Sequence, residues 1–123
     1  MEIIETKSTK TKQPIISDSD KTWLEAVENL VQKELADSSF NTSALAEKLM
    51  IDRTQLFRKL KKLTGLSPSQ YIQEARLKKA FELFDNQIYD SVKAVGLSVG
   101  YSNRSSFAAQ FKTRFGKLPS DML

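Results

Sequence analysis

The sequence contains no cysteine and no histidine, and only four glycines and three prolines among its 123 residues. These absences exclude disulfide frameworks, thiolate zinc sites, thiol nucleophiles and an imidazole base. No apolar run reaches the 18 residues that a membrane span needs, and the Thr/Lys-rich residues 1–16 lack the apolar region of a secretory signal. We therefore expect no membrane partner, metal or cofactor, and the missing cysteines are consistent with a cytoplasmic location.

The composition that remains is that of a folded, mildly basic protein. Apolar residues make up 40% of the chain and charged residues 28%, and 19 Lys and Arg against 15 Asp and Glu give a net charge of +4. Disordered chains have fewer apolar residues and charge of mainly one sign. The length allows one ordinary domain or two very small ones on a shared scaffold.

The spacing of apolar residues predicts an all-α domain over residues 21–123, preceded by a flexible leader or interdomain linker over residues 1–20. After Asp20, apolar residues recur at helical spacing, and no Asn-Gly or Asp-Gly hairpin signal appears. Asp20 is the predicted N-cap of the first helix. Its apolar stripe consists of Trp23, Leu24, Val27, Leu30, Val31 and Leu35.

Two short helices follow and form a predicted helix-turn-helix over residues 41–64. Asn41 is the expected cap of the first helix, and Asp52 with Gln55 has the spacing of a capping box that opens the second. Gly65 is the expected stop of the second helix. Leu56, Leu60 and Leu63 give that helix one apolar face.

A long connecting helix is predicted over residues 68–85. The run Ser67-Pro68-Ser69-Gln70 combines an N-cap, a proline in the first turn and a glutamine at the third helical position. The helix is apolar around most of its circumference, so it should be buried between other elements. Its length of about 25 Å would suit a strut between two units.

The chain also repeats itself when it is laid over itself with a shift of 50 and then 51 residues. The matched pairs are Asn41 with Ser91, Asp52 with Asn103, Leu56 with Phe107, Leu60 with Phe111, Gly65 with Gly116 and Pro68 with Pro119. Caps, core positions and breakers agree together, which predicts a second helix-turn-helix over residues 91–116.

Charge is distributed unevenly along this repeat. Residues 53–84 carry eight Lys and Arg against two Asp and Glu, whereas residues 21–52 carry three against six. A helix pair alone is common as ordinary packing, but positive charge that begins at the second helix of the pair is typical of a surface that faces a polyanion.

From about Lys21 to Leu123 the chain resembles the DNA-binding domain of the AraC family of bacterial transcription regulators. The similarity lies in 45–49 (LAEKL), 56–68 (LFRKLKKLTGLSP), 76–80 (RLKKA), 99–103 (VGYSN) and the later Phe107, Phe111-Lys112, Phe115-Gly116 and Pro119. The resemblance implies about seven helices, with two helix-turn-helix units joined by a long helix. It also implies that two recognition helices enter successive major grooves, roughly 34 Å apart on one face of the duplex.

The family's pattern also implies which positions face the groove. The expected base-contacting residues are Thr54, Phe57, Arg58, Arg104, Ser105 and Ala108, with Ala109 beside them. Arg58 has the donors to bond guanine O6 and N7, and Phe57 can meet a thymine methyl group. The expected phosphate-contacting residues are Arg53, Lys59, Lys61, Lys62, Lys112 and Arg114.

Two departures concern the second unit. Family members often carry arginine at the position of Ala109, and alanine at that of Gly96, where glycine costs about 1 kcal/mol of helix propensity unless close packing requires it. We expect the second unit to be less stable and to read fewer bases. Arg76 is interpreted as structural, paired with an acidic side chain inside the scaffold.

Plainer readings exist for several of these residues. Arg58 and the neighbouring lysines are spaced like any solvated helix face, and Phe57 could cover the edge of the core. We assign Tyr71, Phe81, Phe84, Phe107, Phe111 and Phe115 to the core. Glu82, Asp85 and Asp90 have no nucleophile or ligand beside them, so caps and solvent exposure explain them better than catalysis, and no enzyme is expected.

The expected function is sequence-specific binding of double-stranded DNA for transcription regulation in a bacterial cytoplasm. The alternative is a helical adaptor that uses the same fold to bind a protein partner. The resemblance further implies a sensing, receiver or dimerisation domain elsewhere in a longer regulator, and the transcription machinery as a possible partner.

Overall fold

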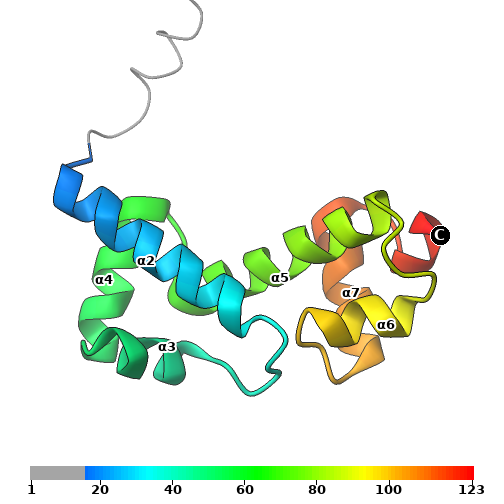
Figure 1. Ribbon diagram of the computed structural model, residues 1–123, viewed down its shortest axis with the longest axis horizontal. Coiled ribbons are helices and arrows are strands. Elements are labelled where there is room, and N and C mark those ends of the chain that lie inside the picture. Colours follow the sequence, from blue (N-terminus) through cyan, green and yellow to red (C-terminus); the bar gives the residue numbers. More distant parts are fainter. Residues whose placement is uncertain (1–15) are drawn as a thin grey trace, which may run out of the picture.

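The computed structural model describes residues 16–123, which form helices and no strand. In chain order the elements are α2 (Asp18–Glu34), α3 (Thr42–Leu49), α4 (Arg53–Thr64), α5 (Pro68–Asp85), α6 (Val92–Ser98), α7 (Arg104–Phe115) and the 3₁₀ helix η1 (Pro119–Met122). Helix α5 connects a group of helices at each end of the molecule (Figure 1). This confirms the predicted all-α fold of two helix pairs on a central helix. Residues 1–15 of the predicted leader lie outside the described residues, and residues 18–20, which were assigned to the leader as well, instead form the first turn of α2.

The predicted helix boundaries of both repeats are confirmed by their capping bonds. The side chains of Asn41 and Ser91 accept hydrogen bonds from the backbone N–H three residues later, each at 3.0 Å, and those of Asp52 and Asn103 do so at 2.8 Å. Ser67 and Gln70 form both bonds of a capping box, whereas Asp52 and Gln55, for which the box was predicted, form only the bond from the Gln55 N–H to the Asp52 side chain. Since caps satisfy N–H groups that a helix start leaves unpaired, these short polar side chains fix where each helix begins.

Both helix stops are confirmed as well. Gly65 and Gly116 end α4 and α7 with φ of 80° and 81°, in the left-handed region that glycine adopts at little cost. The start of the first helix was predicted wrongly. Ser17, and not Asp20, is the N-cap, because its Oγ accepts a hydrogen bond from the Asp20 N–H at 3.2 Å.

Two separate hydrophobic cores lie along α5. The first is built by α2, α3 and α4 against the N-terminal half of α5, and the second by α6 and α7 against its C-terminal half. The first contains Val27, Val31, Leu35, Phe40, Leu45, Ala46, Leu56, Leu60, Ile72 and Ala75, and the second contains Leu77, Ala80, Phe84, Val95, Val99, Phe107 and Phe111. The other predicted core aromatics, Tyr71, Phe81 and Phe115, are half-buried against these two clusters. The predicted assignment of the aromatic residues to the core is confirmed.

Packing explains the glycine in α6. A Cβ atom added to Gly96 would lie 3.0 Å from Cδ2 of Phe107, closer than ordinary carbon contacts. Phe107 is itself 1% exposed. The missing methyl group therefore makes room for an aromatic ring, which compensates for the lower helix propensity of glycine. Among residues 16–123, no helix has both the length and the apolarity of a bilayer span.

Candidate nucleic-acid interface

The two predicted recognition helices, α4 and α7, start at the same edge of the molecule. In Figure 1 both rise from the lower edge, each beside the shorter helix of its pair, α3 or α6. Their N-terminal residues, Arg53 and Arg104, are exposed. A recognition helix contacts base edges with its N-terminal residues, so both units direct the relevant end outward and in the same direction.

The start of α4 carries a compact set of exposed side chains. Thr54, Phe57 and Arg58 line one surface hollow together with Arg53 and with Thr42 of α3. Phe57 is 49% exposed, so it does not serve mainly to cover the core. The structure thus brings the three predicted base-contacting residues of the first unit together. Thr42 was missed, although its place one residue after the Asn41 cap could have marked it.

The start of α7 carries a smaller set. Arg104 and Ser105 are exposed, Ala108 is half-buried and Ala109 is exposed. Arg104 lines a hollow with residues of α6 that sequence reasoning missed, among them Lys93 and Leu97. Leu97 is 52% exposed and occupies the repeat position of Glu47, a polar-to-apolar change that the self-alignment contains.

The predicted phosphate-contacting residues fall into two groups. Arg53, Lys61, Lys62 and Lys112 are exposed, and the structure gives them no ion pair among the described residues. Lys59 instead lies 3.7 Å from the Asp20 carboxylate and 4.6 Å from the centre of the Trp23 ring, which attaches it to α2.

Arg114 is also engaged within the protein. Its Nε and Nη2 donate to both carboxylate oxygens of Glu74 on α5, with shortest distances of 2.8 Å, and its guanidinium lies 4.8 Å from the centre of the Phe115 ring. These hydrogen bonds lower the pKa of Glu74 and raise that of Arg114. Lys59 and Arg114 would therefore have to leave internal partners before binding phosphate.

Arg76 corrects the prediction of an acidic partner. Arg76 is 7% exposed, and its guanidinium donates to four backbone carbonyls and to no carboxylate of residues 16–123. Burial lowers its pKa, but an arginine remains charged at neutral pH. Backbone oxygens at the ends of two helices and in one loop satisfy the charge, so no acidic residue is required.

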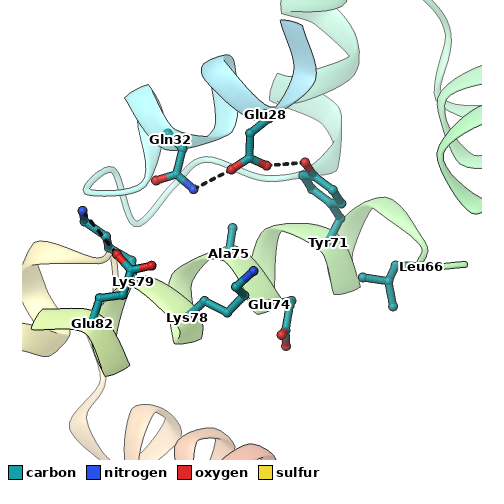
Figure 2. Close-up of a pocket in the computed structure, with 9 residues that line it drawn as sticks. All are labelled: Glu28, Gln32, Leu66, Tyr71, Glu74, Ala75, Lys78, Lys79 and Glu82. Atoms are coloured by element: carbon teal, nitrogen blue, oxygen red, sulfur yellow. Dashed lines mark hydrogen bonds and ion pairs between the residues drawn. The ribbon is translucent and has the colours of Figure 1, made fainter. Parts of the chain in front are cut away.

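A third hollow lies between α2 and α5, away from the helix starts, and Figure 2 shows its lining. Tyr71 and Gln32 both donate to the Glu28 carboxylate, the latter at 3.0 Å, and burial raises the pKa of the Tyr71 phenol. Glu82 lies 3.9 Å from Lys79. The carboxylates of Glu28 and Glu82 thus both have partners. The bond between Tyr71 and Glu28 joins α5 to α2, and neither carboxylate is left unpaired for catalysis.

The three carboxylates considered for catalysis are confirmed as surface groups. Glu82 and Asp85 are exposed on the last turns of α5, and Asp90 is exposed in the loop after it. Residues 16–123 contain no cluster of acidic side chains that would hold a metal ion.

The arrangement defines a class of protein: a bipartite helix-turn-helix domain, in which two capped helix pairs present the starts of their second helices on one side of a shared strut. A helix-turn-helix domain family matches residues 45–123. The chain belongs to this family, in its AraC type. This membership supports the sequence-specific DNA binding for transcription regulation that the sequence predicts.

Individual relatives show the same similarity. The chain is 32% identical over 106 residues to histidine kinase P4 of Formosa agariphila, which covers 85% of this chain and 8% of that protein. It is 32% identical over 102 residues to the Msm operon regulatory protein of Streptococcus mutans, which covers 83% of this chain and 36% of that protein. The chain thus spans only a minor part of these relatives.

Solved structures share the fold. The C-terminal domain of the two-component response regulator yesN from Fusobacterium nucleatum has a TM-score of 0.75 and 25% identity, covering 82% of this chain and 97% of that one. The DNA-binding domain of AdpA, solved in complex with a target DNA, has a TM-score of 0.73 and 23% identity, covering 80% and 86%. At the latter identity the likeness concerns the fold alone.

Proposed function

We propose that the domain binds one face of duplex DNA by inserting the N-terminal ends of α4 and α7 into successive major grooves. The proposed base-contacting residues are Thr54, Phe57, Arg58, Arg104, Ser105 and Ala108. The observation that supports this most is the common edge at which both helices begin, with Arg53 and Arg104 exposed at these starts and Arg58 exposed further along α4. In this proposal the domain acts by binding and positioning on DNA, and not by catalysis.

The basic residues would divide into two roles. Arg58 is placed to donate two hydrogen bonds to guanine, an interaction worth about 1–3 kcal/mol of discrimination. Phosphate binding would rest on Arg53, Lys61, Lys62 and Lys112, because these are exposed and without an ion pair among the described residues. Each phosphate contact should add about −0.9 to the slope of log affinity against log salt concentration.

Selection of bound sequences from a random duplex library tests binding, specificity and spacing together. We expect enriched duplexes with two half-sites about one helical turn, roughly 10 base pairs, apart. Enrichment of a single half-site would contradict the two-groove arrangement. Failure to enrich any sequence, with binding indifferent to salt, would instead favour the adaptor that binds a protein partner.

Two substitutions on α4 separate base reading from phosphate binding. Arg58→Ala should relax the preference for one base pair, with a loss of about 1–3 kcal/mol on the selected site and little on unrelated DNA. Lys62→Ala should weaken all sequences alike and make the salt slope less negative by about 1. Fluorescence anisotropy on selected and scrambled duplexes measures both quantities. A uniform loss for both variants would show that Arg58 does not read a base.

The domain would be the output part of a longer regulator. This rests on the small share of its curated relatives that the chain covers, 8% of one and 36% of another. A sensing, receiver or dimerisation domain would then supply the signal, and the transcription machinery would be the partner once the domain is on DNA.

A further inference from the structure

One charged side chain lies at the boundary between the two hydrophobic cores. Along α5, the first core ends with Ala75 and the second begins with Leu77, and Arg76 lies between them. It is the one buried charged residue among residues 16–123. A buried charge is costly unless its donors are satisfied, so the groups that satisfy it are held in place.

The carbonyls around Arg76 come from both units. Its Nη1 donates to the carbonyl of Leu35, just after α2, at 2.7 Å and to that of Val99, just after α6, at 2.9 Å. Its Nη2 donates to the carbonyls of Asp37 and Phe40, in the loop between α2 and α3, each at 3.1 Å. A single nitrogen atom therefore bridges the backbone of the first unit to that of the second.

Gly100 shows how closely the two backbones approach at this point. It has φ of +94°, and a Cβ atom there would lie 1.4 Å from Nη1 of Arg76 and 2.2 Å from the Leu35 carbonyl oxygen. Any side chain at this position would displace the guanidinium. The second unit thus contributes both an acceptor, Val99, and the space that lets the arginine reach it.

Other connections between the units are few. In the first unit, α3 contacts α2 and α4, and all three helices contact α5. In the second unit, α6 and α7 contact each other and α5, and α7 also contacts η1. The Glu74–Arg114 ion pair joins α7 to α5, but its side chains are 31% and 46% exposed. Exposed pairs of this kind hold geometry weakly, whereas a buried planar guanidinium with four acceptors holds it firmly.

We propose that Arg76 is a positioning residue that fixes the angle between the two helix-turn-helix units, and thereby the half-site spacing that the domain accepts. The second part rests on the proposed two-groove function. Arg76 itself is buried and acts through the ends of α2 and α6, which carry α4 and α7 with them.

The first test needs no DNA. The chain has no cysteine, so spin labels can be placed at one exposed position in each unit through Glu47→Cys and Lys117→Cys. Pulsed electron–electron double resonance should give a narrow distance distribution in this background. Adding Arg76→Gln should broaden or shift it, because an amide cannot bond four carbonyls, while Glu74→Gln, the matched control, should leave it unchanged. An unchanged distribution with Arg76→Gln would overturn the proposal.

The second test uses duplexes selected by the unaltered chain, either as one half-site or as two half-sites with zero, one or two added base pairs between them. The affinity of Arg76→Gln for the single half-site should be within about twofold of that of the unaltered chain. Its affinity for two half-sites at the natural spacing, which is the spacing selected by the unaltered chain, should fall about tenfold or more. Its preference for the natural spacing should also flatten. An equal loss on single and double sites would show a general structural role and overturn the proposal.

Two further outcomes are decisive. If the unaltered chain binds no duplex, the proposed function fails, while the distance measurement still decides the role of Arg76. If circular dichroism shows that Arg76→Gln is unfolded, Arg76→Lys replaces it and should give an intermediate distance width and an intermediate spacing preference. Loss of folding in both variants would assign Arg76 to the fold itself and overturn the proposal.

Discussion

The two helix-turn-helix units share one order of caps, turns and glycine stops but fill their cores differently. The first unit adds α2, whose Val27 and Val31 are fully buried. The second has no such helix among the described residues, and rings fill the space instead: the Phe107 and Phe111 centroids lie 5.8 Å apart, and Phe84 and Phe111 5.7 Å. Large aromatic side chains can thus fill the core volume that a supporting helix fills in the first unit, because burial and close packing stabilise a helix-turn-helix unit whichever residues provide them.

The surfaces of the units differ as well. On α4, four basic residues predicted to contact DNA are exposed without an ion pair among the described residues: Arg53, Arg58, Lys61 and Lys62. On α7 only Arg104 and Lys112 are so, because Arg114 binds Glu74. The first unit therefore offers more positive charge to a polyanion. The expectation that the second unit is less stable and less discriminating remains a prediction.

The largest contrast should come from matched core truncations. Phe107→Ala removes a ring that contacts Tyr101 and Phe111, and should cost about 3–5 kcal/mol of unfolding free energy. Leu56→Ala, its repeat counterpart, should cost about 2–5 kcal/mol, towards the lower end because neighbouring aliphatic chains relax more easily. Urea denaturation of both variants measures the difference. A larger loss for Leu56→Ala would contradict the view that rings carry more of the second core.

The caps of the recognition helices offer a smaller comparison. Asp52→Ala and Asn103→Ala each remove a hydrogen bond of 2.8 Å to the backbone and should each cost about 0.5–2 kcal/mol. Asp52→Ala should cost more of the two, because a carboxylate also interacts favourably with the helix dipole. Thermal melts at low salt test this ranking, and the gap should narrow when salt is raised.

Exchanging the residues at positions 46 and 96 should harm both units. Ala46→Gly weakens α3 by about 1 kcal/mol through helix propensity. Gly96→Ala regains that propensity but forces a methyl group against the buried Phe107, where overpacking costs about 1–3 kcal/mol. We expect a net loss for Gly96→Ala in urea denaturation. A gain in stability would mean that the Phe107 ring moves aside freely.

The smallest effect concerns the exposed link between α7 and α5. The hydrogen bonds from Arg114 hold the pKa of Glu74 below its ordinary value of 4.5 in the folded chain. A lowered pKa in the folded state stabilises the fold above the unfolded value and loses this contribution as the pH falls through the folded value. The melting temperature of Glu74→Gln should therefore be slightly below that of the unaltered chain at neutral pH. The two melting temperatures should converge as the pH falls below 4.5 and through the lowered pKa of Glu74; a constant gap would argue against the linkage.

Local signals predicted most of the fold, since caps and stops act within four residues of where they stand. Asn41, Ser67 and Asn103 could be assigned from sequence because each lies just before an apolar periodic run. Asp20 was predicted as the N-cap in place of Ser17 because residues 17–20 alternate Ser and Asp, and each of these residues can cap a helix.

Side-chain partners that come from distant parts of the chain could not be predicted. Every residue has a backbone carbonyl, so the sequence carries no signal that marks the four acceptors of Arg76, and they could not be predicted. Lys59 and Arg114 were assigned to phosphate on helix position, but α2 and α5 bring Asp20 and Glu74 beside them. The exposed helix starts at Arg53 and Arg104 were predictable because these residues directly follow the caps Asp52 and Asn103.

The shared strut has a consequence for how the domain comes apart. Ile72 and Ala75 form part of one core, and Leu77, Ala80 and Phe84 part of the other, on a single continuous helix. If either core unfolded, α5 would lose its support and could no longer cover the other core. We therefore expect both halves to unfold in one cooperative step. A protease cut inside residues 68–85 should accordingly unfold both helix-turn-helix units at once, and neither unit should remain folded as an independent fragment.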